Sequence, residues 1–223
     1  MKIFDLSILP QAQLALWPKL KKVPGKFVLY GGTAIALRIV HRESIDFDFF
    51  TSDDFVADNL VREMPFLQTA RRIQDSRNTL TVLYDVTGYD CPVRLSFFGG
   101  LQLGRIKPPE KADNGIWVAS LLDLFGMKCA TISQRVEAKD YIDIYAILNM
   151  PEFSLEHGLA AARAIYGKQY NAVLTLKSLS YFKGGNLKTL SDDVKQYLVD
   201  AVKNCDLATV PKMSAQAVIG EEV

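Results

Sequence analysis

Two aspartates alternate with phenylalanines over residues 46–50, in the order Asp-Phe-Asp-Phe-Phe. A period of two residues is typical of a β-strand, which we expect over residues 44–50, and it places Asp46 and Asp48 on the same face. The phenylalanines predict a largely buried strand, and two neighbouring carboxylates in a core are unfavourable unless a cation compensates them. The compensating charge is either a metal ion or a basic side chain such as Arg38 or Arg42, unless water solvates this face of the strand.

Magnesium is the metal ion that best suits such a pair of carboxylates. Mg²⁺ binds through one or two carboxylates and completes its octahedron with water and phosphate oxygens. Mn²⁺ is the alternative ion at the same two ligands, Asp46 and Asp48. Taken alone, the aspartate pair is explained equally well by a metal site and by an ion pair.

A diglycine, Gly31-Gly32, lies between an expected strand at residues 26–30 and an expected helix at residues 33–41. Glycine permits a positive φ and lets a ligand approach the backbone closely. The start of a helix offers unpaired N–H groups and the positive end of its dipole, which together favour an anion. Thr33 is expected to cap this helix. A plain tight turn is the simpler explanation of an isolated diglycine.

The remaining pattern predicts an α+β fold in two domains, residues 1–115 and residues 116–223. The first half mixes strand and helix periods, whereas the second half is mostly helical after a loop rich in Pro, Lys and Gly. Further strands are expected at residues 68–74, 79–84 and 93–98, and further helices at residues 53–64, 121–128, 139–150, 155–166, 170–182 and 192–204.

Composition excludes several classes of protein. The 223 residues include 26 Lys and Arg against 25 Asp and Glu, so no global positive field indicates a nucleic-acid binder. The longest uncharged run, residues 6–18, is too short to span a membrane, and the first ten residues lack the order of a signal peptide. Cys91, Cys129 and Cys205 are odd in number and far apart, which predicts buried thiols rather than disulfides or a zinc site. We therefore expect a cytoplasmic protein with no membrane association.

Two separated blocks of sequence together resemble a known signature. Tyr30-Gly-Gly-Thr33, an apolar helix and His41-Arg-Glu-Ser-Ile-Asp-Phe-Asp-Phe-Phe50 resemble the motif of the DNA polymerase β-like nucleotidyltransferases. Within that superfamily the chain is most similar to the AbiEii/AbiGii toxin family. The similarity covers about residues 25–150 and includes a second block, Leu124-Phe-Gly-Met-Lys128, Arg135 and Lys139-Asp-Tyr-Ile-Asp143.

The resemblance implies a polymerase β-like nucleotidyltransferase core, a mixed sheet with flanking helices, followed by a helical C-terminal half. It also implies transfer of a nucleoside monophosphate from an NTP to an acceptor, which would be RNA, such as a tRNA end, or protein. The protein would then be the toxin of an AbiE-like toxin–antitoxin pair, with a cognate antitoxin. The alternatives are an NTP-binding module that has lost catalysis and a small-molecule nucleotidyltransferase of the aminoglycoside type.

The resemblance assigns roles to the residues of the first block. Asp46 and Asp48 would hold Mg²⁺ or Mn²⁺ against the triphosphate, where the metal ion stabilises the charge on the phosphoryl group. The phosphates would be cradled by Gly31, Gly32 and Thr33, with Ser44 supporting that turn or touching a phosphate.

Three residues of the second block also receive roles. Lys128 would reach the phosphates as a point charge on a flexible stem. Asp140 and Asp143 are three apart on a helix and so share a face, and one of them would orient Lys128 or act as a general base. Without the family context, a surface lysine and a charged helix face are the simpler interpretations.

The sequence departs from the wider superfamily at one position. A neighbouring strand usually carries a third carboxylate, but residues 93–98 offer only Ser96, or alternatively Arg94, at that place. A second metal ion would lack its bridging ligand. Either Asp140 or Asp143 substitutes, or Asp90 or Asp85 moves in, or the protein binds nucleotide without efficient transfer.

Overall fold

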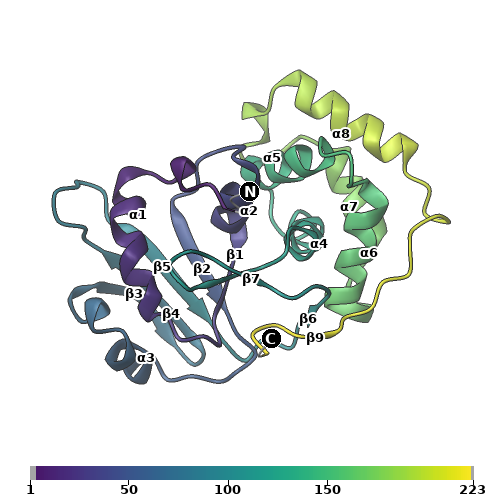
Figure 1. Ribbon diagram of the computed structural model, residues 1–223. Helices are drawn as coiled ribbons and strands as arrows, with labels where there is room; N and C mark the ends of the chain where they lie inside the picture. Colours follow the sequence, from purple (N-terminus) through teal and green to yellow (C-terminus); the bar gives the residue numbers. More distant parts are fainter. Residues whose placement is uncertain (1–3, 222–223) are drawn as a thin grey trace. The chain divides into compact units, whose positions relative to one another are not determined.

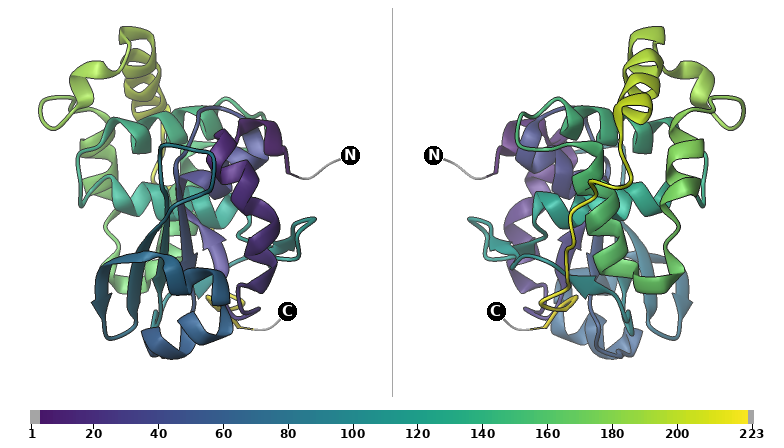
Figure 2. Two further views of the ribbon diagram at one scale, coloured as in Figure 1. Left: turned by 90° about the vertical axis from the view of Figure 1, so that its left-hand side faces the viewer. Right: turned by 90° about the vertical axis from the view of Figure 1, so that its right-hand side faces the viewer.

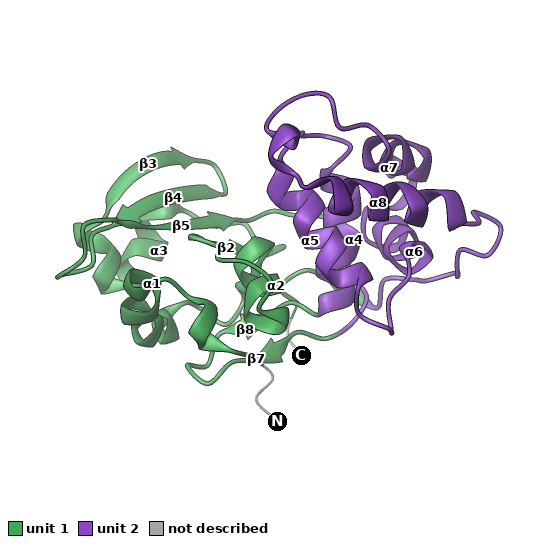
Figure 3. Ribbon diagram, turned by 90° about the horizontal axis from the view of Figure 1, so that it is seen from above, with its two compact units in different colours: residues 1–103, 108–120, 217–223 green, residues 104–107, 121–216 purple. Residues whose placement is uncertain are grey.

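The computed structural model describes residues 4–221 (Figure 1). The chain forms two compact units, coloured separately in Figure 3. Unit 1 comprises residues 1–103, 108–120 and 217–223, and unit 2 comprises residues 104–107 and 121–216. The expected division into domains at residue 115 stays a prediction.

Unit 1 is built on a seven-stranded mixed sheet. Strand β2 pairs in parallel with β5, and β1 pairs in parallel with β8, while the other neighbours are antiparallel. This mixture confirms the predicted α+β class. The order across the sheet is β3 (Arg71–Ser76), β4 (Thr79–Tyr84), β5 (Val93–Phe98), β2 (Asp46–Phe50), β1 (Val28–Tyr30), β8 (Trp117–Val118) and β7 (Glu110–Lys111).

One face of this sheet forms the core of unit 1. Phe47, Phe49 and Phe97 are fully buried, and the rings of Phe49 and Phe97 stack with centroids 5.2 Å apart. Helix α1 (Gln11–Leu16) and the 3₁₀ helix η2 (Trp17–Lys22) lie over this face, as Figures 1 and 2 show, and Trp17 packs 6.1 Å from Phe47. Burial of these large rings provides the main apolar stabilisation of β2.

Helix α2 (Gly31–Ile39) follows β1 without a linker and is anchored at both ends. Its middle turns are apolar and buried. In its last turn, Arg38 donates to the carbonyls of Ala119 and Val118 and forms an ion pair with Glu110. These bonds fix the helix to β8 and β7, and therefore fix its first turn relative to β1.

Unit 2 is helical, and Figure 3 shows its helices packed together. Helices α4 and α6 approach closely because each has a glycine at the contact. A Cβ on Gly126 would lie 2.7 Å from the Cβ of Ala161, and a Cβ on Gly158 would lie 2.7 Å from Cys129 Sγ. The helices are α4 (Leu121–Thr131), α5 (Ala138–Leu148), α6 (Leu155–Tyr166), α7 (Ala172–Leu179) and α8 (Asp192–Asn204).

Four of the expected elements have the predicted bounds: β4, β5, α6 and α8. Others differ: β3 begins three residues later than expected, because residues 65–69 form a 3₁₀ helix, and α3 (Ala57–Glu63) is shorter than expected. No helix within residues 4–221 has the length and apolarity needed to cross a membrane. The remaining short elements are η1 (Leu6–Ile8), η3 (Pro65–Thr69), η4 (Gly167–Gln169), η5 (Leu187–Thr189), β6 (Gly104–Arg105) and β9 (Ala217–Val218).

Candidate active site

The diglycine turn joins β1 directly to α2 in unit 1. Tyr30 is the last extended residue, and the helix begins at Gly31, whose φ is +75°. Only glycine adopts this conformation without steric cost. A Cβ on Gly31 would lie 2.8 Å from Asp48 Oδ2, so the turn passes directly beside that carboxylate. The predicted phosphate-binding turn and one predicted metal ligand are therefore in contact.

The second glycine lies beside two polar side chains that follow α2. A Cβ on Gly32 would lie 2.6 Å from Arg42 Nη2 and 2.9 Å from Ser44 Oγ. A guanidinium and a hydroxyl therefore lie against the first turn of α2, where helix N–H groups are unpaired. Ser44 therefore lies beside the turn, where the resemblance placed it. Arg42, expected only as an ion-pair partner of the aspartates, also lies beside the turn.

The prediction that Thr33 caps the helix is wrong. Because α2 begins two residues earlier, at Gly31, Thr33 lies inside the first turn and is fully buried. Its hydroxyl donates to the carbonyl oxygen of Asp46. Thr33 therefore ties the start of α2 to the start of β2, and its proposed contact with phosphate stays a prediction.

Asp46 and Asp48 share one face of β2, as the period of two predicted. The opposite face carries Phe47 and Phe49, neither of which is exposed. The expectation that the two carboxylates lie inside a core is wrong, because both residues are half-buried and the Asp46 side chain is 28% exposed. The phenylalanines bury only one side of the strand, and the other side presents its acidic groups to a partly open surface.

The neighbouring strand β5 supplies no carboxylate to this face. The parallel register pairs Asp48 with Ser96 and Asp46 with Arg94. Arg94 Nε lies 3.8 Å from Asp46 Oδ1, so the ion-pair interpretation holds for Asp46 even though Arg94 was not among the expected partners. Among residues 4–221 there is no cluster of three or more His, Cys, Asp or Glu side chains that could hold a metal ion.

The residues present fit one divalent cation bound together with a phosphate. Asp46 and Asp48 offer hard oxygen ligands on one strand face, and Asp48 Oδ2 lies against the Gly31 turn. Mg²⁺ and Mn²⁺ both favour oxygen donors, and Mg²⁺ uses few carboxylates when phosphate and water supply the rest. A second ion would have no further carboxylate in the described part of this face.

The other expected residues form a cluster within unit 2. Lys128 of α4 lies with its Nζ 2.6 Å from Asp140 Oδ1 and 2.7 Å from Asp143 Oδ2, both on α5. Both aspartates are completely buried and Lys128 is nearly so. Lys128 is therefore not a surface lysine, and the two aspartates do not form a solvated helix face.

Arg135, in the loop between α4 and α5, completes this cluster. It donates to both oxygens of Asp140, from Nε at 2.7 Å and from Nη2 at 3.0 Å. Burial by itself raises the pKa of Asp140, but Arg135 and Lys128 together outweigh burial and hold that pKa below its usual value. Asp140 is thus a carboxylate fixed between two cations.

Residues 20–206 match the model described as nucleotidyl transferase AbiEii toxin, type IV toxin–antitoxin system. The chain belongs to the AbiEii nucleotidyltransferase toxin family. Both blocks of the candidate site lie inside the matched region, and the resemblance inferred from the motifs is confirmed.

This AbiEii protein is similar in sequence to one curated protein and in fold to several solved structures. An uncharacterized protein of Aquifex aeolicus is 31% identical over 179 residues, which cover 77% of this chain and 80% of that protein. The fold is similar to that of JHP933 from Helicobacter pylori (TM-score 0.55, 17% identity, 86% of this chain and 88% of that chain). It is also similar to that of MenT4, a nucleotidyltransferase toxin from Mycobacterium tuberculosis (TM-score 0.59, 13% identity, 88% and 84%).

Two other predictions about side chains can be compared with the structure. Within residues 4–221 of the AbiEii protein, the three cysteines are all free thiols. The expectation that all three cysteines are buried is wrong, because Cys91 is exposed. His157 caps α6: its Nδ1 accepts from the backbone N–H of Ser154.

Proposed function

We propose that this AbiEii protein transfers a nucleoside monophosphate from a nucleoside triphosphate to an acceptor and releases pyrophosphate. The observation that carries the proposal is the contact between Asp48 and Gly31. This contact puts the carboxylates suited to a divalent cation beside the helix turn suited to phosphate. Triphosphate chemistry needs both at one place, because the metal ion and the phosphate oxygens bind each other.

Asp46 and Asp48 would hold Mg²⁺, or Mn²⁺, which when bound neutralises charge on the phosphoryl group and the leaving pyrophosphate. The first turn of α2 would bind phosphate through its N–H groups, with Thr33 supporting the turn. Arg42 and Ser44, which lie against Gly32, would supply a guanidinium and a hydroxyl to the same anion.

Lys128 would contribute a further positive charge to the triphosphate. Its two buried carboxylate partners hold the amine in one position, so Asp140 and Asp143 are best interpreted as positioning residues. A general-base role suits Asp140 poorly, because its oxygens already accept bonds from Arg135 and Lys128. The acceptor would be RNA, such as a tRNA end, or a protein hydroxyl.

A screen of acceptors tests this proposal. Purified tRNA, whole-cell protein and aminoglycosides are each incubated with one α-labelled NTP at a time, with Mg²⁺, with Mn²⁺ and with a chelator. Label should move to RNA or protein only when a divalent cation is present. Label on aminoglycosides alone would instead identify a small-molecule nucleotidyltransferase.

The Asp46→Ala variant makes the screen specific for the proposed metal site. It should lose transfer by about 10²-fold or more, because it removes a metal ligand while leaving the buried face of β2 intact. Asp193→Ala is the matched control, because Asp193 is an exposed acid in unit 2 and should transfer at the wild-type rate. Transfer at the wild-type rate by Asp46→Ala would refute the metal assignment.

A second candidate function is nucleotide binding without transfer. The observation that favours it is the lack of a carboxylate on β5 beside the two aspartates, because Ser96 is in register with Asp48 and Arg94 with Asp46. Divalent-cation-dependent binding of NTP, with no labelled product from any acceptor pool, would support this function.

The family also suggests a cognate antitoxin, and the substrates would place the reaction in the cytoplasm. Expression of the chain alone should slow growth of its host, and co-expression of the adjacent reading frame should restore growth. Asp46→Ala should be harmless in the same assay, since toxicity would come from transfer rather than from the folded protein itself.

A further inference from the structure

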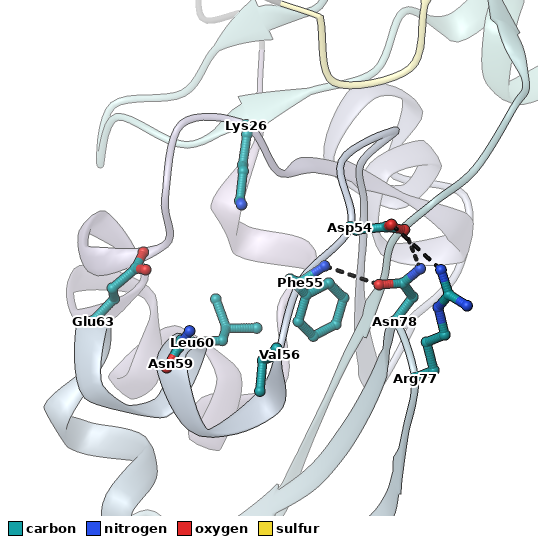
Figure 4. A pocket seen from close by; sticks show the side chains of 9 residues that line it. All are labelled: Lys26, Asp54, Phe55, Val56, Asn59, Leu60, Glu63, Arg77 and Asn78. Carbon is teal, nitrogen blue, oxygen red and sulfur yellow. Dashed lines mark hydrogen bonds and ion pairs between the residues drawn. The ribbon is translucent and has the colours of Figure 1, made fainter.

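A pocket of about 390 Å³ opens in unit 1 (Figure 4). Its position follows from the strands: Lys26 precedes β1, whereas Gly31 follows it, so the pocket and the turn are at opposite ends of that strand. The three residues of β1 alone separate its two ends by roughly 10 Å. The pocket is lined by Lys26, Asp54, Phe55, Val56, Asn59, Leu60, Glu63, Arg77 and Asn78.

The floor of the pocket is apolar and its aromatic ring is held firmly. Leu60 is buried, and the ring of Phe55 lies beside it in the centre of Figure 4. The ring packs edge-to-face on Phe27 at 5.5 Å, and a Cβ on Gly99 would lie 2.6 Å from its Cδ1. Because Gly99 has no side chain, Phe55 sits directly on the backbone there and is a fixed platform for a flat ligand.

One side of the pocket is occupied by groups that already bind each other. Asn78 Nδ2 donates to Asp54, and Arg77 lies 3.6 Å from the same carboxylate. Asn78 Oδ1 also accepts from the backbone N–H of Phe55 at 2.9 Å. Dashed lines in Figure 4 mark these contacts. These residues shape the pocket and position Phe55 rather than offer hydrogen bonds to a ligand.

The opposite side offers groups that a ligand can use. Asn59 and Glu63 lie four residues apart on α3 and so on one face of that helix. Within residues 4–221 the carboxylate of Glu63 has no hydrogen bond or ion pair, and Asn59 uses only its Oδ1, which accepts from Arg62. The ammonium of Lys26 extends into the pocket in Figure 4 and lies 3.8 Å from Asp53, beyond hydrogen-bonding distance.

The charges of the lining side chains select the class of ligand. Lys26 and Arg77 are positive, whereas Asp54 and Glu63 are negative, so the lining is neutral overall. A phosphate or another anion gains little in such a pocket. A flat, uncharged heterocycle that carries both N–H donors and oxygen or nitrogen acceptors matches this lining. Its ring would stack on the aromatic floor, its N–H groups would donate to Glu63, and its acceptors would bind Lys26 and Asn59.

We propose that this pocket binds a nucleobase, stacked on Phe55 and hydrogen-bonded to Glu63, Lys26 and Asn59. Guanine fits best, because one carboxylate accepts from two adjacent N–H groups of its edge while an amine or amide donates to its carbonyl oxygen. The base belongs either to a free nucleoside or to an unpaired nucleotide of an RNA. The proposal does not depend on the transfer reaction, since the pocket is separate from the diglycine turn.

Calorimetric titration of the full chain with guanosine, adenosine, cytidine and uridine tests the proposal. Nucleosides lack phosphate, and the titrations are done in chelator with the Asp46→Ala variant, so the proposed triphosphate site does not contribute. Guanosine should bind most tightly. A short unstructured oligoribonucleotide containing one guanine, titrated alongside, separates the two sources: tighter binding than guanosine indicates an RNA nucleotide, and equal binding indicates a free nucleoside.

Two variants in the same background locate the binding. Phe55→Leu should weaken guanosine binding about tenfold through loss of stacking. Glu63→Gln should weaken it at least tenfold and reduce the preference over adenosine, while Glu152→Gln, at an exposed acid in unit 2, should leave it unchanged. Glu63 is exposed, so its variant will fold. Any of three results would overturn the proposal: no nucleoside binding at millimolar concentration, binding that Glu63→Gln leaves intact, or binding of free amino acids instead.

Discussion

Lys128 and Asp143 form a buried ion pair. The distance from Nζ to Oδ2 is 2.7 Å, and the exposed fraction of the side chain is 8% for Lys128 and zero for Asp143. The pair joins α4 to α5, and Asp140 and Arg135 extend it. Two positive and two negative groups are thus packed together, and the two buried aspartates depend on the cations for compensation.

Replacing one member of this pair should destabilise the fold strongly. We expect Asp143→Asn to lower the free energy of unfolding by about 3–5 kcal/mol, because a buried ammonium loses a compensating charge. Urea denaturation measures this. Asp192→Asn removes an exposed ion pair with Lys195 and should leave the free energy of unfolding nearly unchanged. Equal stability of Asp143→Asn and the wild type would show that the pair is not needed to compensate Lys128.

The pH dependence of stability should report on Asp140. Arg135 and Lys128 hold its pKa below that of the unfolded chain, about 3.9. A carboxylate with a lowered pKa stabilises the fold above its unfolded pKa, and this contribution disappears as the pH falls through the folded pKa. The free energy of unfolding should therefore decrease below about pH 4. Asp140→Asn should be less stable at pH 7 and show a smaller decrease, in urea titrations at successive pH values.

The close approach at Gly32 should matter for transfer rather than for folding. In Gly32→Ala the new methyl group displaces Arg42 and Ser44, whose side-chain ends can move away. We expect a loss of transfer of about tenfold to 100-fold, since small displacements of binding groups have effects of that size. Gly25→Ala is the matched control, because nothing lies within 4 Å of its Cβ. Unchanged transfer in Gly32→Ala would remove Arg42 and Ser44 from the proposed site.

Local patterns predicted the elements whose period is strong. Helix α6 has the expected bounds because Ser154 caps its start and Gly167 ends it. The elements that were missed have no such pattern: α1 is only six residues long, and β7 and β8 have two residues each. Strand β3 is exposed along its whole length, so no alternation marks where it begins.

The same reasoning applies to the candidate site. Asp46 and Asp48 share a strand, so their common face followed from sequence alone, as did the common helix of Asp140 and Asp143. Pairs that depend on tertiary structure could not be read in this way. The position of Arg94 beside Asp46 requires β2 and β5 to pair in parallel with a particular register, which no local pattern specifies.

The positive charge of Arg94 competes with a metal ion for Asp46. The pair is half-exposed and 3.8 Å long, so its loss in Arg94→Ala should tighten Mn²⁺ binding by no more than about fivefold. Arg94→Asp should have a larger effect, since it places a third carboxylate in register with Asp46 and creates a place for a second ion. Titration of Mn²⁺ by electron paramagnetic resonance gives both affinity and stoichiometry.

Arg71→Asp, on exposed β3, controls for the added negative charge. If Arg94→Asp binds Mn²⁺ no better than Arg71→Asp, then Asp46 does not hold the metal ion. Two ions bound to Arg94→Asp would show that Arg94 limits the wild-type site to one ion.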